Sequence, residues 1–493
     1  MIPQLIFDWS KKTPDRTAII YNGRSLSYGA FAQIVAVARG YFARRDCFGA
    51  GYAVLAVRNL IDFWFLSLAL RSLGLTTVVV GSVAEDASDS MPSVQDVVTK
   101  LGLANVQCVV TTPDETWASG LDDLCVKLGL RWLSVSLAGE SALDYGAFET
   151  YHPCGGHIVL TSGTTGAHKM LLMSPDSDAL FLRRIVELLG MNQNSVFSAF
   201  YFWAWTSVGY KWAASPWFVG GATLIEQSRE PHHALRRPGI THGVLVPRML
   251  SAVLAAPANA FPRNEAICLL IGGGAMTRAQ ADQAKSRITP RLFTCLASTE
   301  AGAIAMTSLD TPDDHRWHRL VHDRVVEIVD ESDRVVPTGQ TGRLRIDTTG
   351  GPNGYFNNET ATRAFFKDGF FYPGDLAVSR PDGRIALQGR LTDVINVHGI
   401  KISPALFEDR ICERLGVSGA CLFSMQNGNG EEEFHVVIES PTPINSQRVT
   451  NIIRAEIQML GISHALVKCV SALPRNQIGK VLRQAVRTQF TGT

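Results

Sequence analysis

Short apolar, often β-branched runs alternate with longer helical stretches from about residue 53 to residue 300. Several of these runs end in Gly or Ser/Thr loops, which is typical of buried parallel strands in α/β folds. The predicted strands cover residues 53–58, 76–81, 106–112, 157–163, 243–247 and 266–274. The pattern predicts a large α/β unit built on parallel sheets.

The pattern changes after residue 324. The runs "RVVEIVD", "GRLRID" and "GRIALQGR" are separated by Pro, Gly and Asp, which predicts a small antiparallel β subdomain. Beyond residue 390 follow about one hundred residues with two strand patterns and a helix pattern, enough for a small α+β domain. We therefore expect an N-terminal domain at 1–390 and a smaller C-terminal domain at 391–493.

The most apolar helical stretch is "NLIDFWFLSLALRSLG" at 59–74, interrupted by Asp62 and Arg71. It is short for a bilayer, so we expect a buried helix and no membrane association. The first residues show no signal peptide, and the nine cysteines lack paired spacing, so a reducing cytoplasm is the expected compartment. Lys and Arg (46) balance Asp and Glu (45), which gives no reason to expect a nucleic-acid partner. The oligomeric state is open, with a homodimer as one option.

The first stretch with a chemical signature is "LTSGTTGAHKM" at 160–170, a predicted flexible loop after a strand. Hydroxyl groups, glycines and a lysine can together surround a phosphate, and these are Ser162, Gly163, Thr164, Thr165, Gly166 and Lys169. A P-loop NTPase is excluded, because that motif needs four residues between its glycines and Lys-Ser/Thr directly after the second. An ordinary Ser/Thr/Gly surface loop is the alternative for this stretch alone.

The loop resembles the phosphate loop of the adenylate-forming superfamily, which contains acyl-CoA synthetases, peptide-synthetase adenylation domains and firefly-type luciferases. Further motifs follow in the order of that family. They are "LIGGGAM" (270–276), "LASTEAG" (296–302), "FFYPGDLA" (370–377), "GRLTDVINVHGIKISPALFE" (389–408) and "LPRNQIGKVLR" (473–483). The resemblance is nearest to acyl- and aryl-CoA ligases and covers most of the chain beyond residue 155.

The resemblance implies a two-step reaction. A carboxylate attacks the α-phosphate of ATP and expels pyrophosphate, and the acyl-adenylate then passes its acyl group to a thiol. Because two anions must meet, such a site needs preorganised positive charge and hydrogen-bond donors. The implied cofactors are ATP, Mg²⁺ and coenzyme A, or the phosphopantetheine of an acyl carrier protein.

The resemblance also assigns roles to residues. The catalytic residues would be Lys480, Thr165 and Glu300, with Glu300 and Thr165 holding magnesium. ATP would be bound by Thr161, Ser162, Gly163, Thr164, Thr165, Gly166, Lys169, Gly273, Gly274, Ala275, Ser298, Thr299, Asp375 and Arg390. Within this set, Asp375 would accept hydrogen bonds from the ribose hydroxyls, and Arg390 would be a second ribose or phosphate contact. Each assignment has a plainer alternative: an exposed lysine for Lys480, a helix-capping residue for Glu300 and a turn for Asp375.

The same resemblance places a hinge and thiol site at Thr392, Asp393, Gly399 and Lys401, where a surface hairpin is the alternative. The acyl pocket would be lined by Phe202, Trp205, Thr206, Gly209 and Gly272. Many of the aromatic residues at 198–226 are expected to be core. The segment lacks the Phe-Asp pair of amino-acid-activating relatives, so we expect an aryl or medium-sized apolar acid.

Four features depart from the family pattern. His168 stands where proline is usual, Met170 where glycine is usual, and Leu296-Ala297 where Tyr-Gly is frequent. The histidine common in acyl-CoA synthetases is replaced by Thr206. These changes raise the alternative of a degenerate nucleotide-binding protein without turnover. The retained Lys169, Glu300 and Lys480 favour instead an AMP-forming acid–thiol ligase, with loading of a carrier protein as the alternative to coenzyme A.

Overall fold

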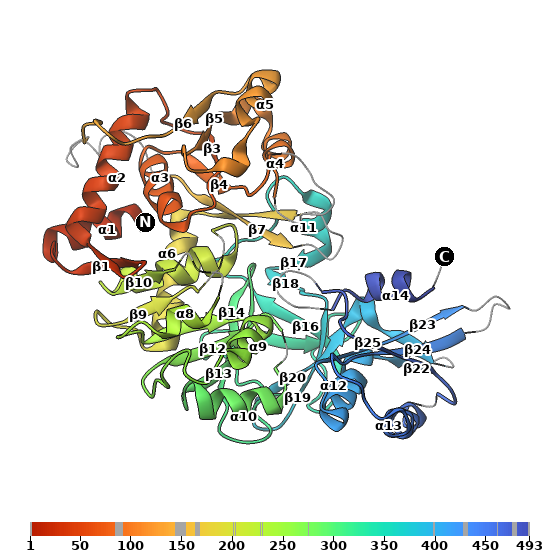
Figure 1. Cartoon of the computed structure of the whole chain (residues 1–493). Coiled ribbons are helices and arrows are strands. Elements are labelled where there is room, and N and C mark those ends of the chain that lie inside the picture. Colours follow the sequence, from red (N-terminus) through yellow and green to blue (C-terminus); the bar gives the residue numbers. More distant parts are fainter. Residues whose placement is uncertain are drawn as a thin grey trace.

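The computed structural model describes residues 2–83, 92–142, 154–162, 168–200, 202, 204–226, 228, 230–274, 276–397, 400–426, 432–460, 462–475 and 481–491. The strands in these residues form five sheets. Figure 1 shows a large part made by the N-terminal and central residues, with a smaller lobe (blue) beside the antiparallel strands β19 and β20. The predicted fold class, a large mixed α/β part followed by a small α+β part, is confirmed.

The first sheet has six strands in the order β6-β5-β3-β4-β7-β8, and it carries the start of the phosphate motif. Every neighbouring pair is parallel except β7 and β8, which form an antiparallel hairpin. The strands are β3 (Tyr52–Leu55), β4 (Thr76–Val79), β5 (Val106–Thr111), β6 (Trp132–Ser134), β7 (His157–Ser162) and β8 (His168–Met173).

The second sheet has eight strands in the order β14-β13-β12-β11-β9-β10-β1-β2. Its central pairs are parallel, and its two outermost pairs are antiparallel. The strands are β1 (Thr17–Tyr21), β2 (Arg24–Ser27), β9 (Val196–Ser198), β10 (Ala222–Ile225), β11 (His242–Leu245), β12 (Cys268–Gly272), β13 (Leu292–Ser298) and β14 (Gly302–Ser308).

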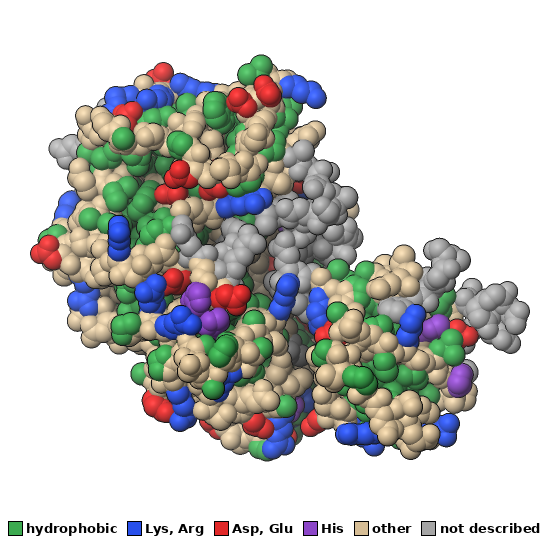
Figure 2. Space-filling view, viewed as in Figure 1, with side chains coloured by type: hydrophobic (Ala, Val, Ile, Leu, Met, Phe, Trp, Pro, Cys, Tyr) green, Lys and Arg blue, Asp and Glu red, His purple; other side chains and the backbone are tan. Residues whose placement is uncertain are grey.

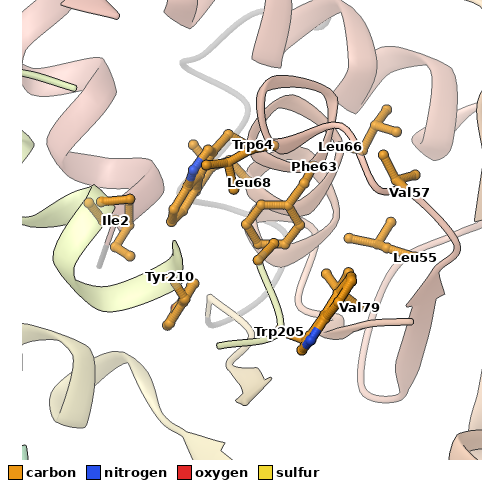
Figure 3. Close-up of a cluster of buried hydrophobic side chains, with 14 of the residues drawn as sticks. Ile2, Leu55, Val57, Phe63, Trp64, Leu66, Leu68, Val79, Trp205 and Tyr210 are labelled. Atoms are coloured by element: carbon orange, nitrogen blue, oxygen red, sulfur yellow. The ribbon is translucent and has the colours of Figure 1, made fainter. Parts of the chain in front are cut away.

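Helices pack against both parallel sheets, and α3 (Leu60–Ser72) is the buried helix that the apolar stretch predicts. The Asn59 side chain accepts a hydrogen bond from the Ile61 N–H at 3.1 Å, which caps the start of α3. Phe63 and Trp64 of α3 lie in a buried cluster with Tyr210 (Figure 3). In the described residues, no helix is long and apolar enough to cross a membrane.

The remaining helices connect these strands. They are α1 (Ile2–Lys12), α2 (Tyr28–Ala43), α4 (Val94–Leu101), α5 (Leu121–Leu128), α6 (Pro175–Leu189), α7 (Ala213–Phe218), α8 (His232–Leu235), α9 (Pro247–Ala255), α10 (Arg278–Arg287) and α11 (Glu359–Phe365). A five-residue π-helix, η4 (Val208–Trp212), directly precedes α7 in the predicted acyl segment. All nine cysteines are free, as their spacing predicts.

The central β subdomain is antiparallel, as predicted after residue 324. Its sheet has the order β17-β18-β16-β19-β20, with β15 paired to β16. The strands are β15 (Val326–Val329), β16 (Gly342–Asp347), β17 (Phe366–Lys367), β18 (Phe370–Phe371), β19 (Asp375–Ser379) and β20 (Ile385–Arg390).

The last hundred residues have their own hydrophobic core, formed around Phe407, Val436 and Ile453. The elements are β21 (Ile395–Val397), β22 (Ile400–Ile402), α12 (Pro404–Leu415), β23 (Gly419–Gln426), β24 (Glu432–Glu439), α13 (Ser446–Gln458), β25 (Leu466–Val470) and α14 (Arg483–Thr491). A domain boundary near residue 390 stays a prediction. β20 ends there, and the 3-10 turn Leu391–Asp393 follows.

Charged side chains of both signs are mixed on the face of the molecule seen in Figure 2. Figure 2 shows Lys and Arg interspersed with Asp and Glu on the face in view, without an extended region of one sign. This mixture agrees with the near-equal counts of the two kinds of charge in the sequence.

Candidate nucleotide and acid site

The phosphate motif begins on β7 and resumes on β8. Thr161 is opposite Lys169 in this hairpin, and Ser162 is opposite His168. Lys169 therefore lies on a strand and not in the flexible loop that the sequence suggested. Gly163, Thr164, Thr165 and Gly166 fall outside the described residues, as does the side chain of Ser162.

The two substitutions beside Lys169 have different surroundings. Met170 is 2% exposed and belongs to the main hydrophobic core, and its carbonyl accepts a hydrogen bond from the Phe356 N–H at 2.8 Å. The His168 carbonyl accepts a hydrogen bond from the Lys100 ammonium at 3.2 Å. Met170 thus fills core space that a glycine would leave empty.

Lys169 lies against two aromatic rings. Its Nζ atom is 3.6 Å from the ring centroid of Phe365 and 4.9 Å from that of Tyr355, which are cation–π distances. Burial lowers the pKa of Lys169, the charge of Arg390 lowers it further, and the carboxylate of Glu300 raises it. The ammonium group is therefore held where Glu300 and Arg390 both influence it.

Glu300 lies in the tight turn between β13 and β14. The Ser298 hydroxyl accepts a hydrogen bond from the Ala301 N–H at 2.9 Å, which stabilises this turn. The alternative that Glu300 caps a helix is wrong, because the residues after the turn continue as strand β14. The Glu300 side chain is 8% exposed, and its Oε1 atom accepts a hydrogen bond from the Tyr355 hydroxyl at 2.7 Å.

Tyr355 connects two predicted site residues that lie 131 positions apart in the sequence, Lys169 and Glu300. Its hydroxyl bonds Glu300, and its ring lies under the Lys169 ammonium. Burial, together with the neighbouring Glu300 carboxylate, raises the pKa of the Tyr355 phenol, so this hydroxyl stays a donor at neutral pH. The sequence analysis missed Tyr355, whose only signal is its place after a glycine in "GPNGYF".

The backbone of the same turn is held by a second residue that the sequence analysis missed. Lys211, in the π-helix η4, is 1% exposed and donates a hydrogen bond to the Thr299 carbonyl at 2.8 Å. Burial lowers the pKa of Lys211 to about 7, although Asp178 and Glu300 both act in the opposite direction. Its only sequence signal is a single lysine inside an aromatic run.

The two predicted ribose contacts are paired with each other. Asp375 and Arg390 are opposite each other on β19 and β20, and their side chains form an ion pair with 2.9 Å between Nε and Oδ1. Gly374 has a φ of +79°, a conformation that favours glycine, and its carbonyl accepts a hydrogen bond from the Leu391 N–H at 2.8 Å. The ribose roles of Asp375 and Arg390 stay predictions.

The predicted acyl-pocket residues lie on β12 and around η4. Trp205 is 3% exposed and packs in the main core cluster (Figure 3). The Thr206 hydroxyl accepts a hydrogen bond from the Gly209 N–H at 3.1 Å, at the start of η4. Gly272 is buried at the end of β12, and Phe202 is half-buried. Gly273 and Gly274 follow Gly272 as exposed backbone, and Ala275 falls outside the described residues.

The predicted hinge residues precede the C-terminal core. Thr392 and Asp393 form the 3-10 turn after β20, and Asp393 is 3.8 Å from the Arg483 guanidinium. Arg483 also forms a two-pronged ion pair with Glu408, at 2.5 and 3.0 Å. The backbone of Lys401 belongs to β22. Gly399, Lys480 and the side chain of Lys401 fall outside the described residues.

Known proteins with similar sequences include acid-activating enzymes by name. Salicylyl-CoA synthase / salicylate adenylyltransferase of Streptomyces sp is 26% identical over 355 residues, which cover 68% of this chain and 63% of that protein. Enterobactin synthase component E of Escherichia coli (strain K12) is 27% identical over 355 residues, covering 67% and 64% respectively. The matched region thus spans less than two thirds of the length of either relative.

The fold is that of a known group of enzymes. The structure of O-succinylbenzoate coenzyme A synthetase from Bacillus subtilis, in complex with ATP and magnesium ion, matches with a TM-score of 0.80 at 18% identity. The match covers 98% of this chain and 99% of that one. In sequence, a model described as AMP-binding enzyme matches residues 6–356, which is well over half of the 493 residues. The resemblance seen in the motifs is therefore confirmed, and the protein belongs to the AMP-binding enzyme family.

Proposed function

We propose that this protein activates a carboxylic acid with ATP. A carboxylate oxygen bonds to the α-phosphorus, the bond from that phosphorus to pyrophosphate breaks, and an acyl-adenylate remains. The observation that carries the proposal is the meeting of Lys169, Glu300 and Tyr355 at one place in a chain of the AMP-binding family. This places a cation and a carboxylate beside the strand that leads to the phosphate loop.

The side chains have distinct tasks in this proposal. Lys169 and the loop from Thr161 to Gly166 hold the phosphates, with Gly273, Gly274, Ala275, Ser298 and Thr299 alongside. Asp375 accepts hydrogen bonds from the ribose hydroxyls, because a carboxylate can accept two at once. Arg390 keeps Asp375 oriented through their ion pair. Lys480 supplies the positive charge that offsets the approach of the carboxylate to the α-phosphate.

Magnesium suits the groups present at the turn. Glu300 has a buried carboxylate, and the Tyr355 hydroxyl donates to its Oε1 atom and not to Oε2. Over the described part of the chain, no group of three or more His, Cys, Asp or Glu side chains could hold a metal ion. Magnesium that is bound through one carboxylate, with the remaining positions on phosphates and water, needs no such group. We assign Glu300 and Thr165 to this ion, which when bound neutralises phosphate charge.

The acid is proposed to be aryl or medium-sized and apolar, entering near Phe202, Thr206, Gly209 and Gly272. The name of the Streptomyces relative mentions both salicylate adenylation and a salicylyl-CoA product, which supports an aromatic acid. In the second step the acyl group passes to the thiol of coenzyme A, and AMP leaves. A domain at 391–493 would turn at Thr392 and Asp393 to bring Gly399 and Lys401 to the thiol.

Thioester formation tests the acceptor. Purified protein, ATP, magnesium and benzoate or salicylate are incubated with coenzyme A or with a panel of phosphopantetheinylated carrier proteins, and the products are identified by mass spectrometry. We expect an acyl-CoA. If acylated carrier protein forms and acyl-CoA does not, the acceptor is the carrier protein and not coenzyme A. This result would not affect the proposed adenylation step.

A further inference from the structure

A fully buried lysine beneath the Thr299–Glu300 turn has no role in the proposal so far. Lys211 lies in η4, within the aromatic segment that is proposed to bind the acid, and it is 1% exposed. Lysine is rarely buried to this extent, because its amine loses its water shell. A π-helix is itself uncommon and is found often at functional sites. A buried lysine at this position therefore calls for a specific interaction.

Lys211 contacts the backbone of the Thr299–Glu300 turn. Its Nζ atom donates to the Thr299 carbonyl at 2.8 Å and lies 3.8 Å from the ring centroid of Phe181 in α6. An amine donates a hydrogen bond whether it is charged or neutral, so this contact does not depend on its protonation. Thr299 directly precedes Glu300, the carboxylate proposed to hold magnesium. A change in the Thr299 carbonyl would therefore reorient Glu300.

The neighbouring buried carboxylate is already engaged elsewhere. Asp178 Oδ2 accepts hydrogen bonds from the Arg71 guanidinium at 2.6 Å and from the Tyr210 hydroxyl at 2.7 Å. Arg71 and Tyr210 also bond each other at 2.7 Å, which closes a buried triad beside Lys211. This triad stabilises the core on one side of η4, whereas Lys211 reaches from η4 to the turn.

The turn is thus held from two directions. Lys211 fixes the backbone before Glu300, and the Tyr355 hydroxyl fixes the Glu300 carboxylate at 2.7 Å. Gly302, just after the turn, has a φ of +74° and faces Phe181, the ring against which Lys211 packs. A small displacement of η4 would therefore be transmitted to the turn through Lys211 and Phe181.

We propose that Lys211 is a positioning residue that sets the Thr299–Glu300 turn for binding of the ATP–magnesium pair. It links the acid-binding segment to the nucleotide site and touches no substrate itself. This inference rests on the proposed function, because it takes Glu300 as the magnesium carboxylate.

The test compares two substitutions at Lys211 with a matched control in the same π-helix. Lys211→Met removes the donor and keeps an unbranched side chain, and Lys211→Gln keeps a donor on a shorter side chain. Tyr210→Phe removes a buried hydroxyl from the Arg71–Asp178–Tyr210 triad and leaves the turn untouched. Binding of a non-hydrolysable ATP analogue is measured by calorimetry with and without Mg²⁺, and folding is checked by thermal unfolding.

We expect Lys211→Met to weaken analogue binding in Mg²⁺ about tenfold, which is the cost of leaving one buried carbonyl without its hydrogen-bond donor, and to change metal-free binding little. Tyr210→Phe should lower the midpoint of thermal unfolding, and Mg²⁺ should still raise its affinity for the ATP analogue as much as in the wild-type protein. If Lys211→Met does not fold, Lys211→Gln is compared with Tyr210→Phe in the same way, and we expect a smaller loss of analogue affinity in Mg²⁺.

The inference is overturned if folded Lys211→Met keeps the wild-type gain in affinity from Mg²⁺, or, where Lys211→Met does not fold, if Lys211→Gln keeps that gain in full. It is also overturned if Tyr210→Phe loses as much of that gain as the Lys211 variant. The proposed function fails separately, if the wild-type protein binds the analogue neither with nor without Mg²⁺.

Discussion

The hydrogen bond between Tyr355 and Glu300 gives the sharpest prediction about the nucleotide site. Tyr355→Phe removes one hydroxyl and keeps the ring that lies against Lys169. Both partners are buried, with Tyr355 6% and Glu300 8% exposed, so water does not simply replace the lost donor. The Glu300 carboxylate would then lose the contact that fixes its orientation before magnesium and ATP bind.

The size of the effect follows from the kind of bond. A hydrogen bond to a charged group contributes about 1.5–3 kcal/mol, which corresponds to about 10- to 150-fold in an equilibrium constant. Part of this cost falls on the stability of the ligand-free protein, so we expect the KM for ATP–magnesium to rise about tenfold. The KM for the acid should change less than about threefold, since Tyr355 is bonded to Glu300, the proposed magnesium carboxylate, and not to the proposed acyl segment.

The assay is acid-dependent exchange of pyrophosphate into ATP at varied magnesium. Tyr372→Phe is the matched control, because the Tyr372 hydroxyl also donates to a carboxylate, Asp333, at 3.0 Å. Arg343 and Lys367 also bond Asp333, and none of these residues belongs to the proposed site. An unchanged KM for ATP–magnesium in folded Tyr355→Phe, or an equal rise in Tyr372→Phe, would refute the reasoning.

Three further predictions concern the proposed catalytic lysine, the Thr299–Glu300 turn and the helix α3. Lys480→Ala should abolish pyrophosphate exchange while largely sparing thiolysis of supplied acyl-adenylate, and equal loss in both assays would contradict its role. Gly302→Ala should lower the thermal midpoint by several degrees, because a Cβ at φ +74° would collide with the Phe181 ring; an unchanged midpoint would argue against this packing. Burial, with Glu115 and Asp114 nearby, raises the pKa of Asp62 to about 6. The folded protein therefore binds this proton more tightly than the unfolded chain, and the contribution to stability is lost as pH rises from about 4 to about 6. The thermal midpoint of the wild-type protein should therefore fall between these pH values, and Asp62→Asn should remove that fall. The same pH profile of the midpoint in both proteins would contradict the raised pKa of Asp62.

Local pattern was sufficient to predict much of the fold. The strands β3, β4, β5 and β12 are short runs of mainly apolar and β-branched residues, and the hairpins after residue 324 are separated by turn-forming residues, so each is visible in a short window. α3 is predicted as a buried helix because its apolar stretch is short for a bilayer and is interrupted by Asp62 and Arg71. The strand β8 was missed because Lys169 and His168 were read as part of the Ser/Thr/Gly loop.

The site was less predictable, because its contacts join distant parts of the chain. Thr299 and Glu300 stand out through their motif, but Tyr355 and Lys211 touch them from other elements, and no local spacing reveals these contacts. The sequence does not distinguish a buried lysine from an exposed one. The role of Lys211 is therefore recognised only from its hydrogen bond to the Thr299 carbonyl. Met170 likewise looks like a lost glycine until its packing in the core is seen.

The most direct test of the central claim is ATP–pyrophosphate exchange in the wild-type protein with a panel of carboxylic acids. The account predicts exchange that requires both magnesium and an acid, and that is strongest with aromatic or medium-sized apolar acids. A protein that is folded and binds ATP, yet gives no acid-dependent exchange across the panel, would contradict it and favour a nucleotide-binding protein without turnover.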